Sequence, residues 1–284
     1  MMFRFNFDED GAAAALTNET PSNQSSAAPK RPARRHVAAP PTEPPAANEF
    51  IVVPVGPVLS MAIVNQHHPR FLSRTGELAS LLTTSDIQTG VYEGGFKLWE
   101  CAVDLIQYLA ANAPNLPVHN GWRVLELGCG HGLPGLHALQ QGAAHVTFSD
   151  YNHEVIELAT IPNLQRNANA NDLTKATFYS GDWQLMSEDM LAHGTDMEFD
   201  LILTAETIYT ESVSVELFQT IQRHLKRRGG IALVAAKSYY FGTGGSVHHF
   251  KSLVAQDGTM VARTVWESND AKSNVREIVH VSYA

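Results

Sequence analysis

The stretch that decides the fold is VLELGCGHG, residues 124–132, in which a short apolar run leads directly into a glycine-rich turn. A short apolar run that ends in a glycine turn is typical of a fully buried strand. Gly128, Gly130 and Gly132 let the backbone turn tightly and approach a ligand closely, because glycine has no Cβ. A helical pattern follows, so the free N–H groups of its first turn would face a ligand bound at this loop.

Strands and helices alternate on the C-terminal side of this loop. Strands are predicted at 122–127, 145–149, 176–180, 199–205 and 231–237, and helices near 133–141, 153–170, 212–226 and 246–256. This alternation indicates a parallel sheet covered on both faces. Two more β-rich runs, 260–268 and 275–284, are joined by a short polar turn and must pair as an antiparallel hairpin. The sequence therefore predicts an α/β protein with a seven-stranded Rossmann-like sheet, five parallel strands plus a C-terminal antiparallel hairpin. This strand count and ending resemble the seven-stranded methyltransferase fold.

The N-terminal part of the chain has a different composition. Residues 10–48 are rich in Ala, Pro, Ser, Thr and Asn and contain few large apolar groups. Such a segment cannot offset the entropy of ordering, so we expect 1–48 to be disordered and 49–284 to form the methyltransferase domain with an N-terminal helical and β extension. Within the tail, Lys30–His36 (KRPARRH) is a basic patch. This patch is either functional, as a nuclear localisation signal or an RNA contact, or a solvated linker.

Composition excludes several classes of function. The 284-residue chain has a formal net charge of −9, which argues against a broad electrostatic grip on nucleic acid or an acidic membrane. The start, MMFRFNFDED, is no secretory signal, and we expect no membrane span. Two cysteines, Cys101 and Cys129, indicate a reducing compartment rather than a disulfide scaffold. The adjacent histidine pairs lack partners at metal spacing, so we expect no metal.

Acidic residues around the glycine loop suit a nucleoside cofactor. Asp150 ends the next strand, where a carboxylate can accept both ribose hydroxyls. The loop also satisfies the dinucleotide pattern, so a nicotinamide cofactor is an alternative. Glu126 stands two residues before the first glycine, in the form typical of S-adenosylmethionine enzymes, where a carboxylate helps to hold the methionine amino group. Asp182 could bond the adenine amine and Trp183 could stack on the ring, and the C-terminal hairpin replaces the second half of a nicotinamide domain. These features favour S-adenosylmethionine.

A second stretch, TGVYEGGFKLWECAVDLIQYL at 89–109, leads from a glycine turn into an amphipathic helix predicted at 97–112. Trp99 and Glu100 lie in its first turn. An aromatic face stabilises a cation by about 0.5–2 kcal/mol, so the two residues could form a wall around a sulfonium. Alternatively, Trp99 packs in the core and Glu100 partners the helix dipole. Spacing alone leaves both open.

Five motifs in this order resemble the protein-histidine N-methyltransferase family: GVYEGGFKLWEC (90–101), LELGCGHGLPG (125–135), SDYN (149–152), AETIY (205–209) and KSYYFGTGGS (237–246). The resemblance covers about residues 85–284, and its first and last motifs are the specific ones. It implies a cofactor site lined by Leu98, Trp99, Glu100, Cys101, Gly128, Asp150, Tyr151, Asn152, Asp182, Trp183 and Ala205. It also implies methylation of a histidine on a large-subunit ribosomal protein, in the cytoplasm and nucleus.

The ETIY segment follows the strand at 199–205, at the sheet edge where ligands bind. A neutral imidazole needs no strong base before it attacks, but it must be held in the correct tautomer. We expect Glu206 or Tyr209 to orient the imidazole or take its leaving proton; alternatively, Glu206 caps the following helix and Tyr209 packs. A protein-lysine methyltransferase of the same fold and a non-catalytic cofactor-binding module are the competing functions. We expect a monomer whose catalytic domain binds no nucleic acid directly.

Overall fold

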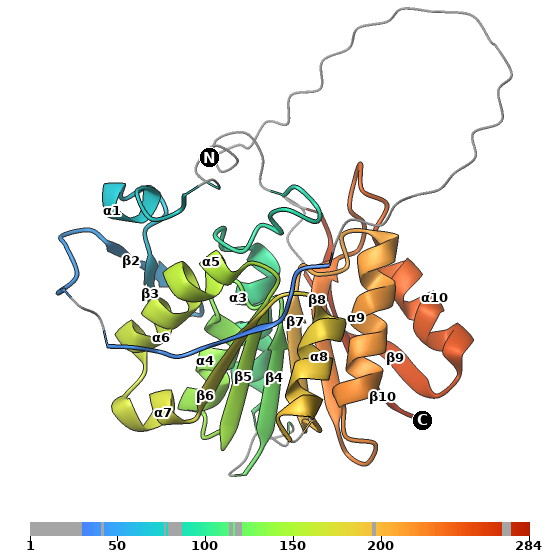
Figure 1. Cartoon of the computed structure of the whole chain (residues 1–284). Helices are drawn as coiled ribbons and strands as arrows, with labels where there is room; N and C mark the ends of the chain where they lie inside the picture. Colours follow the sequence, from blue (N-terminus) through green and yellow to red (C-terminus); the bar gives the residue numbers. More distant parts are fainter. Residues whose placement is uncertain are drawn as a thin grey trace, which may run out of the picture.

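The computed structural model describes residues 30–40, 43–76, 78, 87–113, 116, 121–194, 197–268 and 274–284. Within these residues one large sheet forms the centre of the molecule, with helices on both faces (Figure 1). Its eight strands have the order β1-β6-β5-β4-β7-β8-β10-β9. The predicted disorder of residues 1–29 lies outside the described residues.

The five predicted parallel strands are all present: β4 Arg123–Leu127, β5 His145–Asp150, β6 Ala176–Ser180, β7 Leu201–Ala205 and β8 Ile231–Lys237. Strands β9 Met260–Glu267 and β10 Arg276–Tyr283 form the antiparallel hairpin, and β10 pairs antiparallel with β8. The chain runs outward from β4 through β5 to β6, then returns to β7 on the other side of β4. Open α/β sheets bind ligands beyond the strand C-termini at such a reversal.

The eighth strand was not predicted. Strand β1, Arg34–His36, pairs antiparallel with β6 and lies in the basic patch that we expected to be disordered (Figure 1). The imidazole of His36 is buried, with Nδ1 3.1 Å from Glu157 Oε1 and Nε2 2.8 Å from Ser180 Oγ. The edge of β6 supplies backbone partners, so a segment with few apolar groups is ordered by polar contacts that composition does not reveal. The expectation of disorder is therefore wrong for residues 34–36.

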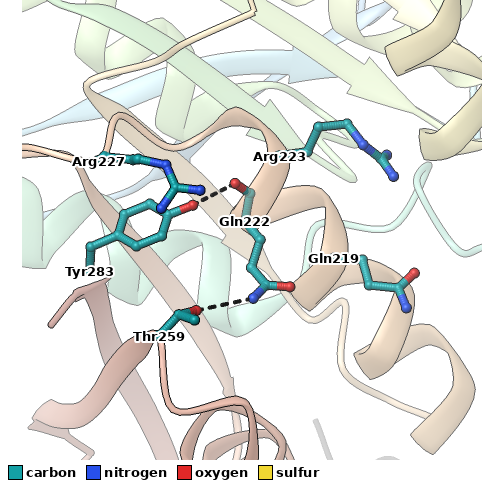
Figure 2. A pocket seen from close by; sticks show the side chains of 6 residues that line it. All are labelled: Gln219, Gln222, Arg223, Arg227, Thr259 and Tyr283. Atoms are coloured by element: carbon teal, nitrogen blue, oxygen red, sulfur yellow. Dashed lines mark hydrogen bonds between the residues drawn. The ribbon is translucent and has the colours of Figure 1, made fainter.

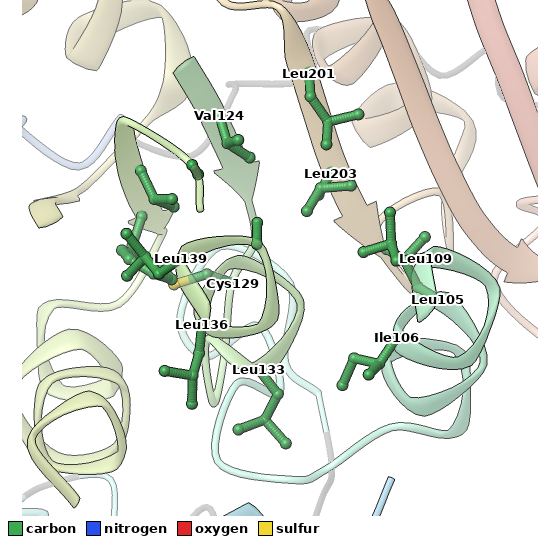
Figure 3. Close-up of a cluster of buried hydrophobic side chains, with 14 of the residues drawn as sticks. Leu105, Ile106, Leu109, Val124, Cys129, Leu133, Leu136, Leu139, Leu201 and Leu203 are labelled. Carbon is green, nitrogen blue, oxygen red and sulfur yellow. The ribbon is translucent and has the colours of Figure 1, made fainter. Parts of the chain in front are cut away.

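Helices cover both faces of the sheet. One face carries α3 Glu100–Asn112, α4 Leu133–Gln140 and α6 Ile161–Asn167, and the other carries α8 Trp183–Ala192, α9 Glu211–His224 and α10 Val247–Asp257. Figure 3 shows the first core, in which side chains of α3 and α4 meet Val124 of β4 and Leu203 of β7. Helix α8 was not predicted.

The helix predicted at 153–170 is broken into shorter elements. These are α5 His153–Val155, the π-helix η1 Ile156–Thr160 and α6, followed by the separate α7 Ala170–Thr174. Pro162 lies in the first turn of α6, where its missing N–H cannot continue the preceding ladder. The change of helix type at this point is consistent with that lost donor.

A small β-hairpin precedes the main sheet. Strands β2 Phe50–Pro54 and β3 Ser60–Val64 pair antiparallel, and α1 Pro69–Leu72 follows them. The side chain of Asn163 in α6 accepts a 2.8 Å hydrogen bond from the Val64 N–H, which fastens the hairpin to the domain. None of the helices in the described residues is long and apolar enough to cross a membrane. Cys101 and Cys129 are both free and buried.

Candidate active site

The loop between β4 and α4 requires glycine at two positions, because of its backbone angles and its close contacts. Gly128 and Gly130 have φ of +63° and +49°, in the left-handed region that L side chains avoid. A Cβ on Gly128 would lie 2.6 Å from Cγ2 of Thr207, and one on Gly130 would lie 3.1 Å from the Gly95 carbonyl oxygen. The loop is therefore in close contact with the segment after β7 and with the turn before α3.

Asp150, at the C-terminal end of β5, faces this loop. Its Oδ2 accepts a 3.0 Å hydrogen bond from the Gly130 N–H, and its Oδ1 accepts one of 3.1 Å from the Asn152 N–H. The residue is only 4% exposed. Burial raises the pKa of Asp150 to about 6, while these two backbone bonds oppose the shift and the charge of Glu93 adds to it.

Glu93 of the YEGG turn lies beside the same carboxylate, and sequence reasoning missed it as a site residue. The Tyr209 hydroxyl donates a short hydrogen bond to Glu93, and the Gly90 N–H donates another to Oε1 at 2.5 Å. Burial, followed by the charge of Glu93, raises the pKa of Tyr209, so the phenol stays protonated. Tyr209 can donate a hydrogen bond but is a poor proton acceptor, which leaves Glu206 as the proton acceptor of the predicted pair.

Glu206 holds an unusual backbone conformation directly after β7. Its φ is +59°, and its N–H donates to the Ala235 carbonyl at 2.9 Å. Oε2 accepts a 2.6 Å hydrogen bond from the Tyr240 hydroxyl, whereas buried Oε1 has no hydrogen bond from any described residue and lies 3.7 Å from Lys237 Nζ. Non-glycine residues held in this strained region cluster at functional sites.

The alternative role for Glu206, as the cap of the following helix, is wrong. Helix α9 begins after Thr210, whose side chain accepts the hydrogen bond from the Val213 N–H. The carboxylate of Glu206 is left free of any capping contact in this helix. Its neighbours come instead from β8, from the loop after β8 and from the start of α3, where Cys101 lies close enough for the charge of Glu206 to add to burial in raising the thiol pKa.

Trp99 and Glu100 separate at the start of α3. The Trp99 indole N–H donates to the Gly94 carbonyl at 3.0 Å, and Nζ of Lys97 and Nζ of Lys237 lie 4.5 and 5.3 Å from the centroid of its ring. The ring therefore does stabilise cations, here from the chain itself. The Glu100 side chain is 61% exposed and lies 3.8 Å from Arg276, so the structure does not place it in the wall around the cofactor.

Glu126 braces the helix that follows the loop. Its Oε2 accepts a 2.9 Å hydrogen bond from the Gly135 N–H in the first turn of α4. Burial raises the pKa of Glu126, and this bond opposes the shift. The structure gives this carboxylate a partner within the chain, where the sequence suggested a ligand amino group.

The remaining predicted residues lie just before α3, in the case of Leu98, or at the C-terminal ends of β5 to β7. Asp182 caps α8 by accepting from the Gln184 N–H at 2.9 Å. Asn152 is fully buried and donates to the Val91 carbonyl at 2.8 Å. Leu98, Tyr151, Trp183 and Ala205 are partly buried. Most predicted site residues thus gather at one edge of the sheet, and Glu100 is the clear exception.

The N-terminal arm, defined as residues 30–36, covers the end of this site formed by Tyr151 and Asp182. The Arg31 guanidinium carbon lies 5.1 Å above the centroid of the Tyr151 ring, and the Arg31 carbonyl accepts a 3.0 Å hydrogen bond from the Asp182 N–H. Nζ of Lys30 lies 3.4 Å from Oδ1 of Asp182. Sequence reasoning missed the arm because its partners lie far along the chain.

Comparisons with known proteins show which family the sequence matches. A family model described as "Lysine methyltransferase" matches residues 83–254. Among curated relatives, a histidine protein methyltransferase 1 homolog of Dictyostelium discoideum is 42% identical over 71% of this chain and 62% of its own length. Another from Bos taurus is 38% identical over 66% of this chain and 55% of its own length. A protein N-lysine methyltransferase of Mus musculus is 32% identical over 50% of this chain and 61% of its own length.

The chain therefore spans roughly three fifths of the length of the curated relatives it matches. Among solved structures, a candidate SAM-dependent methyltransferase from Streptococcus mutans has a TM-score of 0.51 at 13% identity, over 84% of this chain and 56% of its own. A candidate methyltransferase solved with SAH has a TM-score of 0.54 at 11% identity, over 84% of this chain and 57% of its own. At these identities the likeness concerns the fold alone.

Proposed function

The chain belongs to the family described as lysine methyltransferase, and from this premise we propose that it methylates a histidine side chain of a protein, with S-adenosylmethionine as the methyl donor. The choice of histidine over lysine has support from relatives. Those at 42% and 38% identity carry the name histidine protein methyltransferase 1 homolog, whereas the lysine-named relative matches half of the chain at 32%.

The buried carboxylate of Glu206, whose Oε1 contacts Lys237 Nζ at 3.7 Å but accepts no hydrogen bond from the described residues, is the structural observation that carries the proposal. Oε1 is buried without a hydrogen bond from the described residues, while Tyr240 holds Oε2. A buried carboxylate beside a substrate lysine would favour the ammonium form, which has no lone pair to attack with. A neutral imidazole keeps a lone pair on one nitrogen while its other N–H donates to a carboxylate. The site therefore suits histidine better than lysine.

The residues around the glycine loop fit the cofactor. Glycines at 128 and 130, where a Cβ would meet Thr207 and Gly95, let the loop turn tightly at the C-terminal end of β4. Asp150 presents a carboxylate at the end of β5, where ribose hydroxyls can donate to it. When bound, S-adenosylmethionine supplies an electrophilic methyl group on a sulfonium. Among the sequence alternatives, a nicotinamide cofactor has no support from the family match.

Glu206 performs the acid–base part of the reaction. Its carboxylate orients the imidazole by accepting the N–H opposite the attacking nitrogen, and it takes that proton once the ring has been methylated. Tyr240 donates a hydrogen bond to Oε2 of this carboxylate, and Nζ of Lys237 lies 3.7 Å from Oε1, so both oxygens are held in place. Positioning supplies most of the rate, because a neutral imidazole is already a nucleophile.

Finer parts of the proposal rest on the resemblance of the sequence motifs. We propose a large-subunit ribosomal protein as the substrate, and the cytoplasm and nucleus as the places of action. The catalytic domain acts as a monomer on its protein substrate. Because the relatives include enzymes named for histidine and for lysine, the side chain that accepts the methyl group is tested first.

The test is to incubate the purified chain with isotopically labelled S-adenosylmethionine and a ribosomal fraction from cells that lack the modification, and to map the label by tandem mass spectrometry. Label on a histidine that disappears with Glu206→Gln supports the proposal. Label on lysine overturns the substrate and retains the fold. Cofactor binding without label in any fraction favours the non-catalytic module.

A further inference from the structure

His131, in the glycine loop, is a buried histidine whose two ring nitrogens both have partners. The residue is 5% exposed. Its Nε2 lies 2.8 Å from the Phe96 carbonyl oxygen, and its Nδ1 lies 2.9 Å from Nδ2 of Asn163. Phe96 lies in the turn before α3, and Asn163 lies in α6. The imidazole therefore joins the loop to one segment 35 residues before it and to another 32 residues after it.

The hydrogen bonds around Asn163 determine which nitrogen of this ring carries the proton. A backbone N–H can only donate, so the Val64 N–H, 2.8 Å from Oδ1 of Asn163, identifies that atom as the amide oxygen. The amide nitrogen then donates to Nδ1 of His131, which must be an acceptor. Burial lowers the pKa of His131 to about 4, so the ring is neutral at pH 7. Its single proton is consequently on Nε2 and is donated to the Phe96 carbonyl.

The turn that receives this hydrogen bond, residues 93–96, forms one side of the candidate active site. A Cβ on Gly95 would lie 3.2 Å from Oδ2 of Asp150, and one on Gly130 would lie 3.1 Å from the Gly95 carbonyl oxygen. The carboxylate of Glu93 is close enough for its charge to raise the pKa of Asp150 further. The turn thus lies against both the glycine loop and the carboxylate assigned to the ribose.

Other hydrogen bonds attach the same turn to neighbouring elements. The Glu93 N–H donates to Oδ1 of Asn152, after β5, at 3.0 Å. The Gly94 carbonyl accepts from the indole N–H of Trp99, at the start of α3, at 3.0 Å. The bond from His131 attaches the turn to the glycine loop. Removing that bond therefore leaves the turn fastened to the end of β5 and to α3, but weakens its attachment to the loop.

We propose that His131 is a positioning residue for the cofactor, because it holds the turn 93–96 against the glycine loop before the cofactor binds. A site whose parts are already fixed loses less conformational entropy when it takes up its ligand, and so binds more tightly. The inference rests on the proposed function through its cofactor, S-adenosylmethionine, and does not depend on which side chain accepts the methyl group.

Two amide variants separate the two nitrogens of the imidazole. Glutamine places its amide nitrogen near the position of Nε2, so His131→Gln can still donate to the Phe96 carbonyl. Asparagine places its amide oxygen near the position of Nδ1, so His131→Asn keeps an acceptor for Asn163 but does not reach Phe96. In both variants, Nδ2 of Asn163 keeps the backbone carbonyl at position 131 as an acceptor, 3.1 Å away in the natural protein.

The experiment is a calorimetric titration of the full chain and of both variants with S-adenosylhomocysteine. His131→Asn should bind about tenfold more weakly than the natural protein, because the Phe96 carbonyl loses its donor. His131→Gln should stay within about threefold of the natural protein, because it retains that donor. Equal affinities in the two variants would overturn the proposal, since a role confined to folding does not distinguish them by cofactor affinity.

Tyr283→Phe is the control for the loss of one hydrogen bond elsewhere in the fold. The Tyr283 hydroxyl donates to the Gln222 carbonyl at 2.6 Å, beside a cavity of about 460 Å³ lined by residues of α9 and β10 (Figure 2). Val281 pairs with Ala232 near the start of β8, so this bond lies at the opposite end of the strands from the glycine loop. Tyr283→Phe should lower the free energy of unfolding and leave the cofactor affinity within about twofold.

Hydrogen exchange on the natural protein tests the proposal even if a variant fails to fold. The N–H groups of Glu93 and Phe96 both have side-chain acceptors, Oδ1 of Asn152 and the hydroxyl of Tyr92. If His131 holds this turn in place beforehand, both N–H groups should exchange slowly before S-adenosylhomocysteine is added. Fast exchange that becomes slow only with ligand would overturn the proposal. A failure to methylate histidine would change none of these binding and exchange results, so the two proposals fail separately.

Discussion

The hydroxyl of Tyr240 donates a 2.6 Å hydrogen bond to Oε2 of Glu206, a residue whose φ is +59°. Such a conformation costs about 1–3 kcal/mol for a residue other than glycine. The bond from the Glu206 N–H to the Ala235 carbonyl holds the backbone in this state, and Tyr240 fixes one carboxylate oxygen. The second oxygen is thereby held in a defined place without a hydrogen-bond partner from the described residues.

Replacing Glu206 with Gln should reduce turnover about 10²–10⁴-fold, because an amide cannot take the proton that the imidazole loses. The affinity for S-adenosylmethionine should stay within about twofold, since the loop and Asp150 are unchanged. Single-turnover kinetics and calorimetry separate the two effects. Glu100→Gln is the matched control, because that carboxylate is exposed and away from the loop, and it should leave both values unchanged. If Glu206→Gln turned over at the rate of the natural protein, the acid–base role of Glu206 would be contradicted.

Cofactor affinity should fall as the pH drops below about 6. The raised pKa of Asp150 means that its carboxylate takes up a proton there, and the protonated acid no longer accepts two ribose hydroxyls. Binding that requires the ionised form weakens by up to tenfold for each pH unit between the pKa of the free protein and the lower pKa of the complex. Calorimetric titration with S-adenosylhomocysteine from pH 7.5 to 5 measures this slope.

Asp150→Asn provides the control for this titration, and the same pKa shift affects folding stability in the opposite direction to cofactor affinity. Asp150→Asn should bind weakly, with no pH dependence in that window; a flat profile for the natural protein would contradict the role of Asp150. Because its folded-state pKa lies above the ordinary value of 3.8, Asp150 contributes stability that is lost as the pH rises from about 3.8 through 6. Buried His131, with its pKa lowered to about 4, acts in the opposite direction, so the contribution of Asp150 is measured as the difference between ligand-free thermal melts of the natural protein and of Asp150→Asn across this range.

Gly128→Ala should destabilise the protein by about 2–4 kcal/mol, from left-handed strain plus overpacking against Thr207. Gly229→Ala is the matched control: its φ is +76° and nothing lies within 4 Å of the added Cβ, so it reports strain alone at about 1–2 kcal/mol. Adding Thr207→Ser to Gly128→Ala removes the clashing Cγ2 and keeps the hydroxyl that contacts Thr204. Denaturant unfolding should show recovery in the double variant; equal losses with and without Thr207→Ser would exclude the clash.

The parallel strands were predictable because each is an apolar run that ends in a turn or a polar residue, a local signal. The sequence analysis proposed Glu100 and missed Glu93, because the positions of these two carboxylates do not follow from local signals. Both carboxylates flank the same glycine turn, and positive φ angles at Gly90 and Gly94 direct the chain so that Glu93 meets Tyr209 while Glu100 faces Arg276. Which carboxylate faces the loop depends on that turn, and spacing along the sequence does not contain this information.

Strand β1 escaped prediction for a related reason. Its ordering depends on residues more than 120 positions away, such as Ser180, which contacts His36, and Glu157, which contacts Arg34. Composition measures only how much apolar surface a segment can bury, and this arm is ordered mainly by backbone pairing and charge. Likewise, Asp182 was predicted as a site residue, but no local signal pointed to Lys30, which contacts its carboxylate, or to Arg31, whose carbonyl accepts from its N–H.

The docking of the N-terminal arm can be tested without changing the arm itself. A Cβ added to Gly181, which has φ of +114°, would lie 2.4 Å from the Pro32 carbonyl oxygen, so Gly181→Ala should push residues 30–36 off the edge of β6. Trypsin cleavage after Arg34 and Arg35 should become at least about tenfold faster, because the docked strand must open before it is cut.

Gly194→Ala serves as the control, since its φ of +62° brings similar backbone strain with nothing within 4 Å of the new Cβ. It should leave the cleavage rate of the arm near that of the natural protein. Because Arg31 covers Tyr151 and Lys30 contacts Asp182, release of the arm should also change the affinity for S-adenosylhomocysteine. Equal cleavage rates in all three proteins would mean that the arm is already undocked in solution, and an unchanged affinity despite faster cleavage would separate the arm from the cofactor site.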